Sequence, residues 1–181
     1  MRRLVFSSLA FQLFAVTAPA AVEVIDDRRV VLRRDSPAQR VIALAPHLTE
    51  LVFAAGAGNR LVGKVRGSGN RIADVERLER LGFAVLVLEP RRLEDIPRHM
   101  RMLGVLLGTG GHAQAAALAF VSRADRLRER YRGRSAVSVL FQAWHQPLIT
   151  VSADLITRQT PRVLDAAEKI CAELDTVRSQ S

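Results

Sequence analysis

The chain has 181 residues, of which 49% are hydrophobic and 25% are charged, and this composition is that of a folded globular protein. Its formal net charge is +9, and all but two of its 27 basic residues are arginines. Nucleic-acid-binding proteins are also basic, but these arginines are spread along the chain, and the aromatic residues, at 5%, form no interleaved stacking platform. Composition therefore excludes a disordered chain and argues against nucleic acid as a partner.

The first twenty residues follow the pattern of a secretory signal peptide. Arg2 and Arg3 give a charged start, a mostly apolar stretch follows, and Ala18 and Ala20 stand at the two positions that a signal peptidase reads. We therefore predict that residues 1–20 are removed and that the mature protein lies in the periplasm. The alternative interpretation is a buried N-terminal helix.

After residue 20, short apolar runs alternate with helical patterns. The apolar runs 22–25 and 30–32 flank a polar turn, Asp-Asp-Arg-Arg, and predict a β-hairpin. Further apolar runs predict strands at 40–45, 61–65, 83–88 and 138–141. Periodic apolar positions predict helices at 49–55, 72–81, 93–107, 112–132 and 161–174. Strands that alternate with helices indicate an α/β fold with a mostly parallel sheet.

The two longest predicted helices each place their apolar residues on one face, because these residues recur at helical spacing. In the helix at 112–132 the shared face comprises Ala113, Ala117, Phe120, Ala124, Leu127 and Tyr131. In the closing helix it comprises Val163, Leu164, Ala167, Ile170, Cys171 and Leu174. Cys171 is the single cysteine, so it cannot close an intrachain disulfide, and its apolar surroundings predict a small buried core residue.

The sequence contains no arrangement typical of catalysis or of a metal site. No glycine-rich loop matches a dinucleotide or phosphate fingerprint, and no serine elbow is present. The acidic pairs 26–27 and 94–95 fall in a turn and at a helix start, where they favour turning and capping. None of the histidines has a partner at metal-ligand spacing; they are His47, His99, His112 and His145. The sequence therefore favours binding over catalysis and predicts neither an enzyme, nor a cofactor, nor a metal.

One stretch suits a ligand. Residues 142–147, Gln-Ala-Trp-His-Gln-Pro, follow a predicted strand and contain the only tryptophan, Trp144, with His145 beside it. A tryptophan at a strand end offers a large apolar face and one N–H donor. The alternative is a tryptophan that caps the core.

Residues 40–56 contain Pro46-His47-Leu-Thr-Glu after an apolar strand, and this segment resembles the opening strand and helix of the cobalamin, siderophore and haem receptors of ABC importers. Further stretches that resemble the cobalamin branch, in the same order, are 66–70 (RGSGN), 89–96 (EPRRLEDI) with 106–109 (LLGT), and 142–147 (QAWHQP). The stretch 153–167 resembles the last loop and helix of the family.

The resemblance implies two α/β lobes joined by one long rigid helix, here 112–132, with the ligand between the lobes. It implies a monomeric periplasmic protein that captures a corrinoid as transported ligand and delivers it to the membrane permease of an ABC importer. By this resemblance Pro46 and His47 line one wall of the cleft, and Asp154 and Arg158 make polar contacts on the other. The full set of expected ligand contacts is Pro46, His47, Arg66, Gly67, Trp144, His145, Asp154 and Arg158.

Two stretches of the family pattern are missing. In the family pattern a strand–helix–strand unit lies between the positions that correspond to residue 65 and Arg66, which are adjacent here. Most of the second lobe of the family lies between the positions that correspond to residue 152 and Asp154. We therefore divide the chain into a signal peptide (1–20), an N-terminal lobe with the backbone helix (21–134) and a remnant of the second lobe (135–181).

Several alternatives remain open at this point. The ligand of a related receptor is an iron siderophore or haem, and a degenerate fragment could act only as an interaction module. Asp154 and Arg158, four residues apart, could also form a structural ion pair instead of contacting a ligand.

Overall fold

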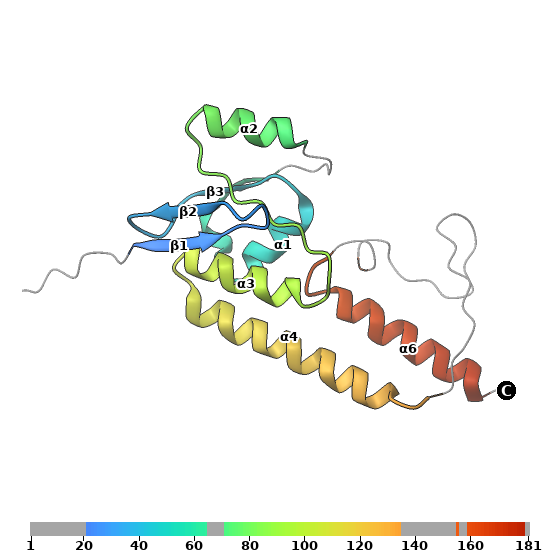
Figure 1. Cartoon of the computed structure of the whole chain (residues 1–181). Coiled ribbons are helices and arrows are strands. Elements are labelled where there is room, and N and C mark those ends of the chain that lie inside the picture. Colours follow the sequence, from blue (N-terminus) through green and yellow to red (C-terminus); the bar gives the residue numbers. More distant parts are fainter. Residues whose placement is uncertain (1–20, 65–70, 135–154, 156–158, 180–181) are drawn as a thin grey trace, which may run out of the picture.

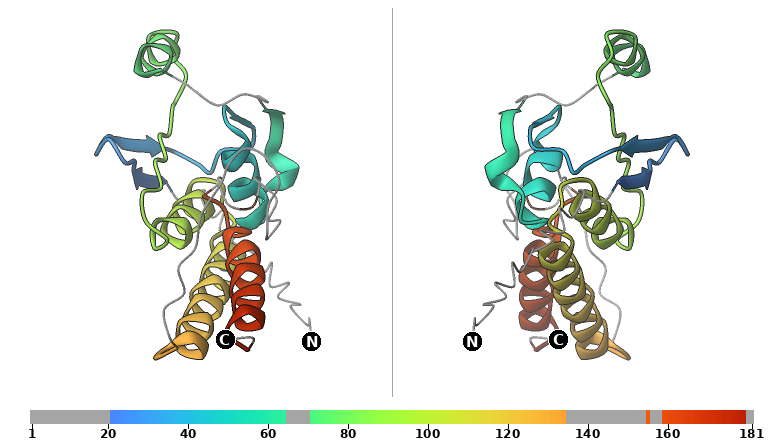
Figure 2. Two further views of the ribbon diagram at one scale, coloured as in Figure 1. Left: turned by 90° about the vertical axis from the view of Figure 1, so that its right-hand side faces the viewer. Right: turned by 90° about the vertical axis from the view of Figure 1, so that its left-hand side faces the viewer.

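The computed structural model of the chain describes residues 21–64, 71–134, 155 and 159–179 (Figure 1). The strands lie on one side of helix α3, helix α4 lies on its other side, and helix α6 runs alongside α4 (Figures 1 and 2). In chain order the elements are β1 (Val22–Ile25), β2 (Val31–Arg34), β3 (Val41–Ala43), α1 (Pro46–Ala54), a 3-10 turn (Gly58–Arg60), β4 (Leu61–Lys64), α2 (Ile72–Arg80), α3 (Asp95–Leu106), α4 (Gly110–Tyr131) and α6 (Val163–Ser179).

The predicted hairpin is confirmed as the antiparallel pair β1–β2, in which Val22 pairs with Arg34 and Ile25 pairs with Val31. Its turn is closed by Asp26, whose buried carboxylate accepts hydrogen bonds of 2.9 Å from the backbone N–H groups of Arg28 and Val30. An aspartate that binds the backbone two and four residues ahead fixes a tight turn. The turning role predicted for the acidic pair is therefore confirmed.

The strands predicted at 40–45 and 61–65 are confirmed as the parallel pair β3–β4. Helix α1 connects them and packs against both strands, as a parallel pair requires. It begins at Pro46, three residues before the predicted start, because a proline already has the φ of a first helical residue and needs no N–H partner there. Ile42, opposite Gly63 in the register, is 61% exposed, so one face of this sheet is uncovered among the described residues.

The strand predicted at 83–88 is wrong. Residues 83–90 form no ladder, and the carboxylates of the hairpin turn take up backbone groups that a neighbouring strand would have used. Asp27 Oδ2 accepts a 2.6 Å bond from Glu89 N–H, and the carbonyl of Val87 accepts a 3.1 Å bond from Asp27 N–H. Leu88 still reaches the core, whereas Phe83 is 61% exposed. The fold is α/β as predicted, but its described parallel sheet has two strands.

Helices α3 and α4 pack closely and bury the predicted face of α4. Ala113, Ala117, Phe120 and Ala124 are buried, whereas Leu127 and Tyr131, in the last turns, are half-buried. A Cβ added to Gly104 of α3 would lie 2.4 Å from the Cβ of Ala113 in α4, so this close approach requires glycine in α3. One hydrophobic cluster joins α1, α3, α4 and the start of α6.

The outer helices α6 and α2 are less well covered. Helix α6 buries Leu164 and Ala166, but Cys171 is only half-buried, which corrects the prediction of a buried core residue. The cause is that, among the described elements, the main contact of α6 is with α4, so its middle and end bury little (Figure 2). Helix α2 lies at the edge of the molecule with Val75 as its buried residue, and its Glu79 accepts a 2.9 Å hydrogen bond from Arg28 of the hairpin turn (Figure 1).

The predicted strand at 138–141 lies outside the part of the chain that the structure describes. Within it, no helix combines the length and the apolarity that crossing a membrane requires.

Candidate functional site

The carboxyl ends of β3 and β4 meet at one edge of the parallel pair, and α1 begins at that edge. Ligands of α/β proteins bind beyond the carboxyl ends of parallel strands, so this edge is the candidate ligand site. Ala45, the residue before α1, is extended, and no side chain caps its first turn. Pro46 and His47 form the start of the helix and are both partly exposed.

The far end of α1 is fixed to the start of α4. Leu51, Val52 and Ala55 are buried in the core, and the chain then leaves the helix at Gly56 with a φ of +76°. A Cβ at Gly56 would lie 2.5 Å from Cδ2 of the His112 ring, so this ring packs directly over the glycine backbone. Helix α1 is therefore held against the backbone helix α4, and the direction in which Pro46 and His47 project depends on that contact.

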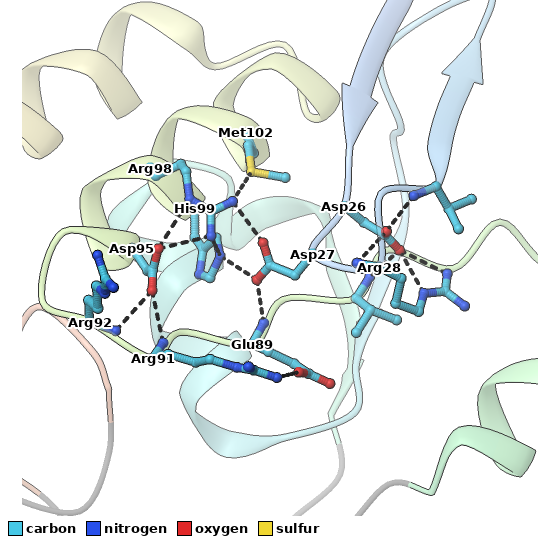
Figure 3. A network of polar contacts seen from close by, with 12 residues as sticks. Asp26, Asp27, Arg28, Glu89, Arg91, Arg92, Asp95, Arg98, His99 and Met102 are labelled. Atoms are coloured by element: carbon cyan, nitrogen blue, oxygen red, sulfur yellow. Dashed lines mark hydrogen bonds and ion pairs between the residues drawn. The ribbon is translucent and has the colours of Figure 1, made fainter.

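A polar network holds the hairpin to α3 (Figure 3). The carboxylate of Asp27 lies 2.7 Å from Nη1 of Arg98 and 2.8 Å from Nε2 of His99. Arg98 also donates a 3.0 Å bond to Asp95 Oδ1, and Asp95 Oδ2 accepts bonds of 2.9 Å from the backbone N–H groups of Arg91 and Arg92. The network therefore connects the hairpin turn, the segment at 83–90 and the first two turns of α3.

The charges of this network are set by opposing effects. Burial raises the pKa of Asp27, but the hydrogen bonds from Arg98 and from Glu89 N–H, together with the nearby positive charges, outweigh burial and bring that pKa below its usual value. The backbone N–H of Arg91, with those of Arg92 and the Arg98 side chain, lowers the pKa of Asp95 to about 2. Burial lowers the pKa of His99, despite the opposing charge of Asp27. Both carboxylates are therefore ionised, and His99 is neutral, at neutral pH.

The network has the geometry of a structural ion cluster. His99 has no exposed surface, so its imidazole cannot touch a substrate. Among the described residues no group of three or more histidine, cysteine, aspartate or glutamate side chains could hold a metal ion. Sequence reasoning missed this network because Asp27 and His99 lie 72 positions apart, and no local spacing connects them.

Of the residues expected to contact a ligand, the structure describes two. Pro46 and His47 are brought together at the edge described above. Arg66 and Gly67 follow closely on Lys64, the last residue of β4, but they lie outside the described residues. Trp144, His145, Asp154 and Arg158 also lie outside them. All eight positions, Pro46 and His47 included, remain predicted ligand contacts.

No protein-family profile matches the chain. It is 27% identical over 154 residues to a vitamin B12-binding protein of Vibrio campbellii, a match that covers 65% of this chain and 56% of that protein. It is 28% identical over 159 residues to a vitamin B12-binding protein of Pectobacterium carotovorum, covering 67% of this chain and 58% of that protein. The chain therefore spans a little over half the length of these relatives.

The alignments also locate part of the difference in length. The aligned region is 154 positions long, yet it includes only 65% of the 181 residues of this chain. The relative therefore carries extra residues inside the aligned region. This agrees with a chain shortened internally.

A solved structure shows the same fold. The crystal structure of the periplasmic vitamin B12-binding protein BtuF of Vibrio cholerae matches with a TM-score of 0.61 and 19% identity, over 78% of this chain and 98% of that chain. The α/β fold of this chain is therefore similar to the fold of that protein.

Proposed function

We propose that this chain is a periplasmic binding protein that captures a corrinoid and presents it to the membrane permease of an ABC importer. The observation that carries the proposal is the agreement between two independent similarities, to the sequences of vitamin B12-binding proteins and to the fold of one of them. The start of α1 supports the proposal, because it lies at the edge where α/β folds bind ligands.

The chemistry of a corrinoid fits the proposed contacts. A corrinoid is large, with an apolar ring face and amide groups at its rim, so its site needs a flat apolar wall and a few polar partners. Trp144 would supply the wall, and Asp154 and Arg158 would accept and donate hydrogen bonds to the amides. Pro46 and His47 would line the opposite side.

The internal shortening predicts weak binding. Two stretches that contribute walls in the family pattern are missing, so we expect a dissociation constant of micromolar order or weaker, equivalent to about 8 kcal/mol or less. The C-terminal remnant, at 135–181, is too short to fold alone without a disulfide, a bound metal or a partner to pack against. Its helix α6 supports docking on the first lobe, because Leu164 joins the same hydrophobic cluster as Phe120.

Titration calorimetry with cyanocobalamin tests the proposal directly. We expect binding by the full mature chain, and we expect Trp144→Ala to lose more affinity than a change of Asp154 or Arg158, because stacking area is lost together with a donor. Phe83→Ala is the matched control, since it truncates an aromatic side chain that is already 61% exposed. Equal affinity in Trp144→Ala and the wild type would remove Trp144 from the site.

The same protein preparation distinguishes the competing ligands. After mixing with cyanocobalamin, a ferric siderophore or haem, gel filtration separates bound from free ligand, and retained absorbance identifies the ligand. Retention of haem or siderophore alone would replace corrinoid as the ligand. Retention of none of the three, together with no heat of binding for any of them in calorimetry, would favour a fragment that acts only in protein interactions.

The periplasmic location rests on the signal-peptide pattern of residues 1–20 and on the periplasmic relative of known structure. N-terminal sequencing of protein recovered from the periplasm should give a chain that begins at Ala21. A soluble cytoplasmic form that keeps residues 1–20 would contradict this assignment.

A further inference from the structure

Three segments of the chain meet at the carboxylate of Asp27. The carboxylate belongs to the turn of the β1–β2 hairpin, it accepts a 2.6 Å bond from Glu89 N–H in the segment at 83–90, and it faces Arg98 and His99 of α3 (Figure 3). The hairpin has no other described ion pair with α3. Its attachment to the helix therefore depends on these few polar contacts together with the packing of buried Val24.

The hydrogen-bonding pattern fixes the protonation state that His99 can hold. An ionised carboxylate only accepts hydrogen bonds, so Nε2 of His99 must carry the proton that it shares with Asp27 Oδ2 at 2.8 Å. The other ring nitrogen, Nδ1, is buried and has no hydrogen-bond partner. A second proton would therefore create a buried N–H without an acceptor, which costs free energy that the neutral ring does not incur.

The charged groups around the ring act in both directions. Asp27 favours the protonated ring, and Asp95, one turn away, does so more weakly, whereas Arg98 Nη2 lies 3.0 Å from Nε2 and opposes a positive charge. The ring has no exposed surface, so water cannot offset the cost of charging it. Burial is the largest of these effects and keeps the ring neutral to a lower pH than in a free histidine.

We propose that His99 is a proton-operated latch that holds the β1–β2 hairpin on α3 at neutral pH and releases it in mild acid. Protonation of Nδ1 moves the ring toward water, where the new N–H finds an acceptor. This movement separates Asp27 from α3 and breaks the hydrogen bond that Glu89 N–H donates to Asp27. The close packing of α3 on α4 contains no such group and stays intact. The device is independent of the ligand proposed above.

The latch predicts a definite pH range. Because the folded state holds His99 below its usual pKa, the unfolded or released state binds more protons, and the latch weakens as the pH falls below about 6.5. One linked proton limits the change to about tenfold in the opening equilibrium per pH unit.

Hydrogen exchange detected by NMR on the full mature chain, at pH 7.5 and at pH 5.5, tests the proposal. After correction for intrinsic exchange, the amides of Asp27 and Glu89 should lose protection by several-fold to tenfold, while those of α4 around Phe120 should not change. His99→Gln keeps an N–H donor toward Asp27 but cannot titrate, so its protection should be independent of pH in this range. His112→Gln is the matched control, because it removes an imidazole that takes no part in the contacts of Asp27, so the pH dependence of the Asp27 and Glu89 amides should match that of the wild type.

Two outcomes would overturn the latch. One is equal protection of Asp27 and Glu89 at both pH values in the wild type, and the other is the same loss in His99→Gln as in the wild type. If His99→Gln does not fold, the imidazole resonances of the wild type decide the matter. A His99 ring that titrates at or above the pKa of a free histidine would contradict the proposal.

Discussion

Arg123 of α4 donates two hydrogen bonds of 2.6 Å to the carboxylate of Glu168 in α6, across 45 positions of sequence. Asp165, one turn before Glu168, lies 2.7 Å from the same guanidinium. The two carboxylates raise the pKa of Arg123, and Arg123 in turn lowers the pKa of Glu168. Because the later turns of α6 bury little, this forked contact adds to the attachment that the buried Leu164 gives α6.

A double-mutant cycle of Arg123→Ala and Glu168→Ala should give a coupling energy of about 0.5–1 kcal/mol. The value is modest because both side chains are more than a third exposed, so solvent screens the pair. The coupling should shrink in 1 M salt. Chemical denaturation measures each variant, and Arg126→Ala, on the same helix, serves as the control. A coupling of zero at low salt would show that apolar contacts alone hold α6.

Phe120→Ala should lower the free energy of unfolding by about 3–5 kcal/mol, as is usual for a buried aromatic side chain. Phe120 is 6% exposed and belongs to the cluster that joins α1, α3, α4 and α6. Leu118→Ala, on the same helix at a position 53% exposed, should change stability by about 0.5 kcal/mol or less. Thermal melts of the two variants check this, and similar melting temperatures would contradict the packing of α4 described here.

Gly56→Ala should destabilise the protein by at least about 1–2 kcal/mol, because any other residue at a φ of +76° is strained. The added methyl group would also meet the His112 ring. The double variant with His112→Ala should recover the steric part and keep the backbone part. Gly110→Ala is the control, since an added Cβ there meets nothing within 4 Å. Urea denaturation of these three variants and of His112→Ala alone separates the two contributions.

Stability should also fall between about pH 4 and pH 2. The folded state lowers the pKa of Asp95 from 3.8 to about 2, so this carboxylate contributes stability above pH 3.8 and loses it as the pH falls through the folded value. After allowance for solvent screening, the contribution is about 1 kcal/mol. Asp95→Asn should flatten the curve of urea midpoint against pH in that range, whereas Glu94→Gln, one residue away, should not.

Local rules were enough to predict most elements. The spacing of Ala113, Ala117, Phe120 and Ala124 depends only on helix geometry, and the structure buries these residues. The turn at Asp26 likewise depends on bonds within four residues. The residues that determine these two features lie close together in the sequence, so the sequence alone predicts them.

Features that depend on distant partners were not predictable in the same way. Residues 83–88 have the composition of a strand, but a strand forms only where a neighbouring strand pairs with its backbone. Here Asp27 of the hairpin turn binds the backbone groups of Val87 and Glu89 instead. The contact between Asp27 and His99 crosses 72 positions and left no local pattern. For the candidate site, Pro46 and His47 were predicted from the family resemblance of residues 40–56, and they remain predicted ligand contacts.

The uncovered face at Ile42 has a consequence for the behaviour of the protein in solution. A two-stranded parallel sheet with an apolar residue 61% exposed presents backbone groups and apolar surface to any other copy that approaches it. The net charge, +9 for the full chain and +7 once Arg2 and Arg3 leave with residues 1–20, keeps such copies apart through mutual repulsion. Concentrated salt screens that repulsion, so the protein should be most soluble at low ionic strength and should precipitate as salt is added.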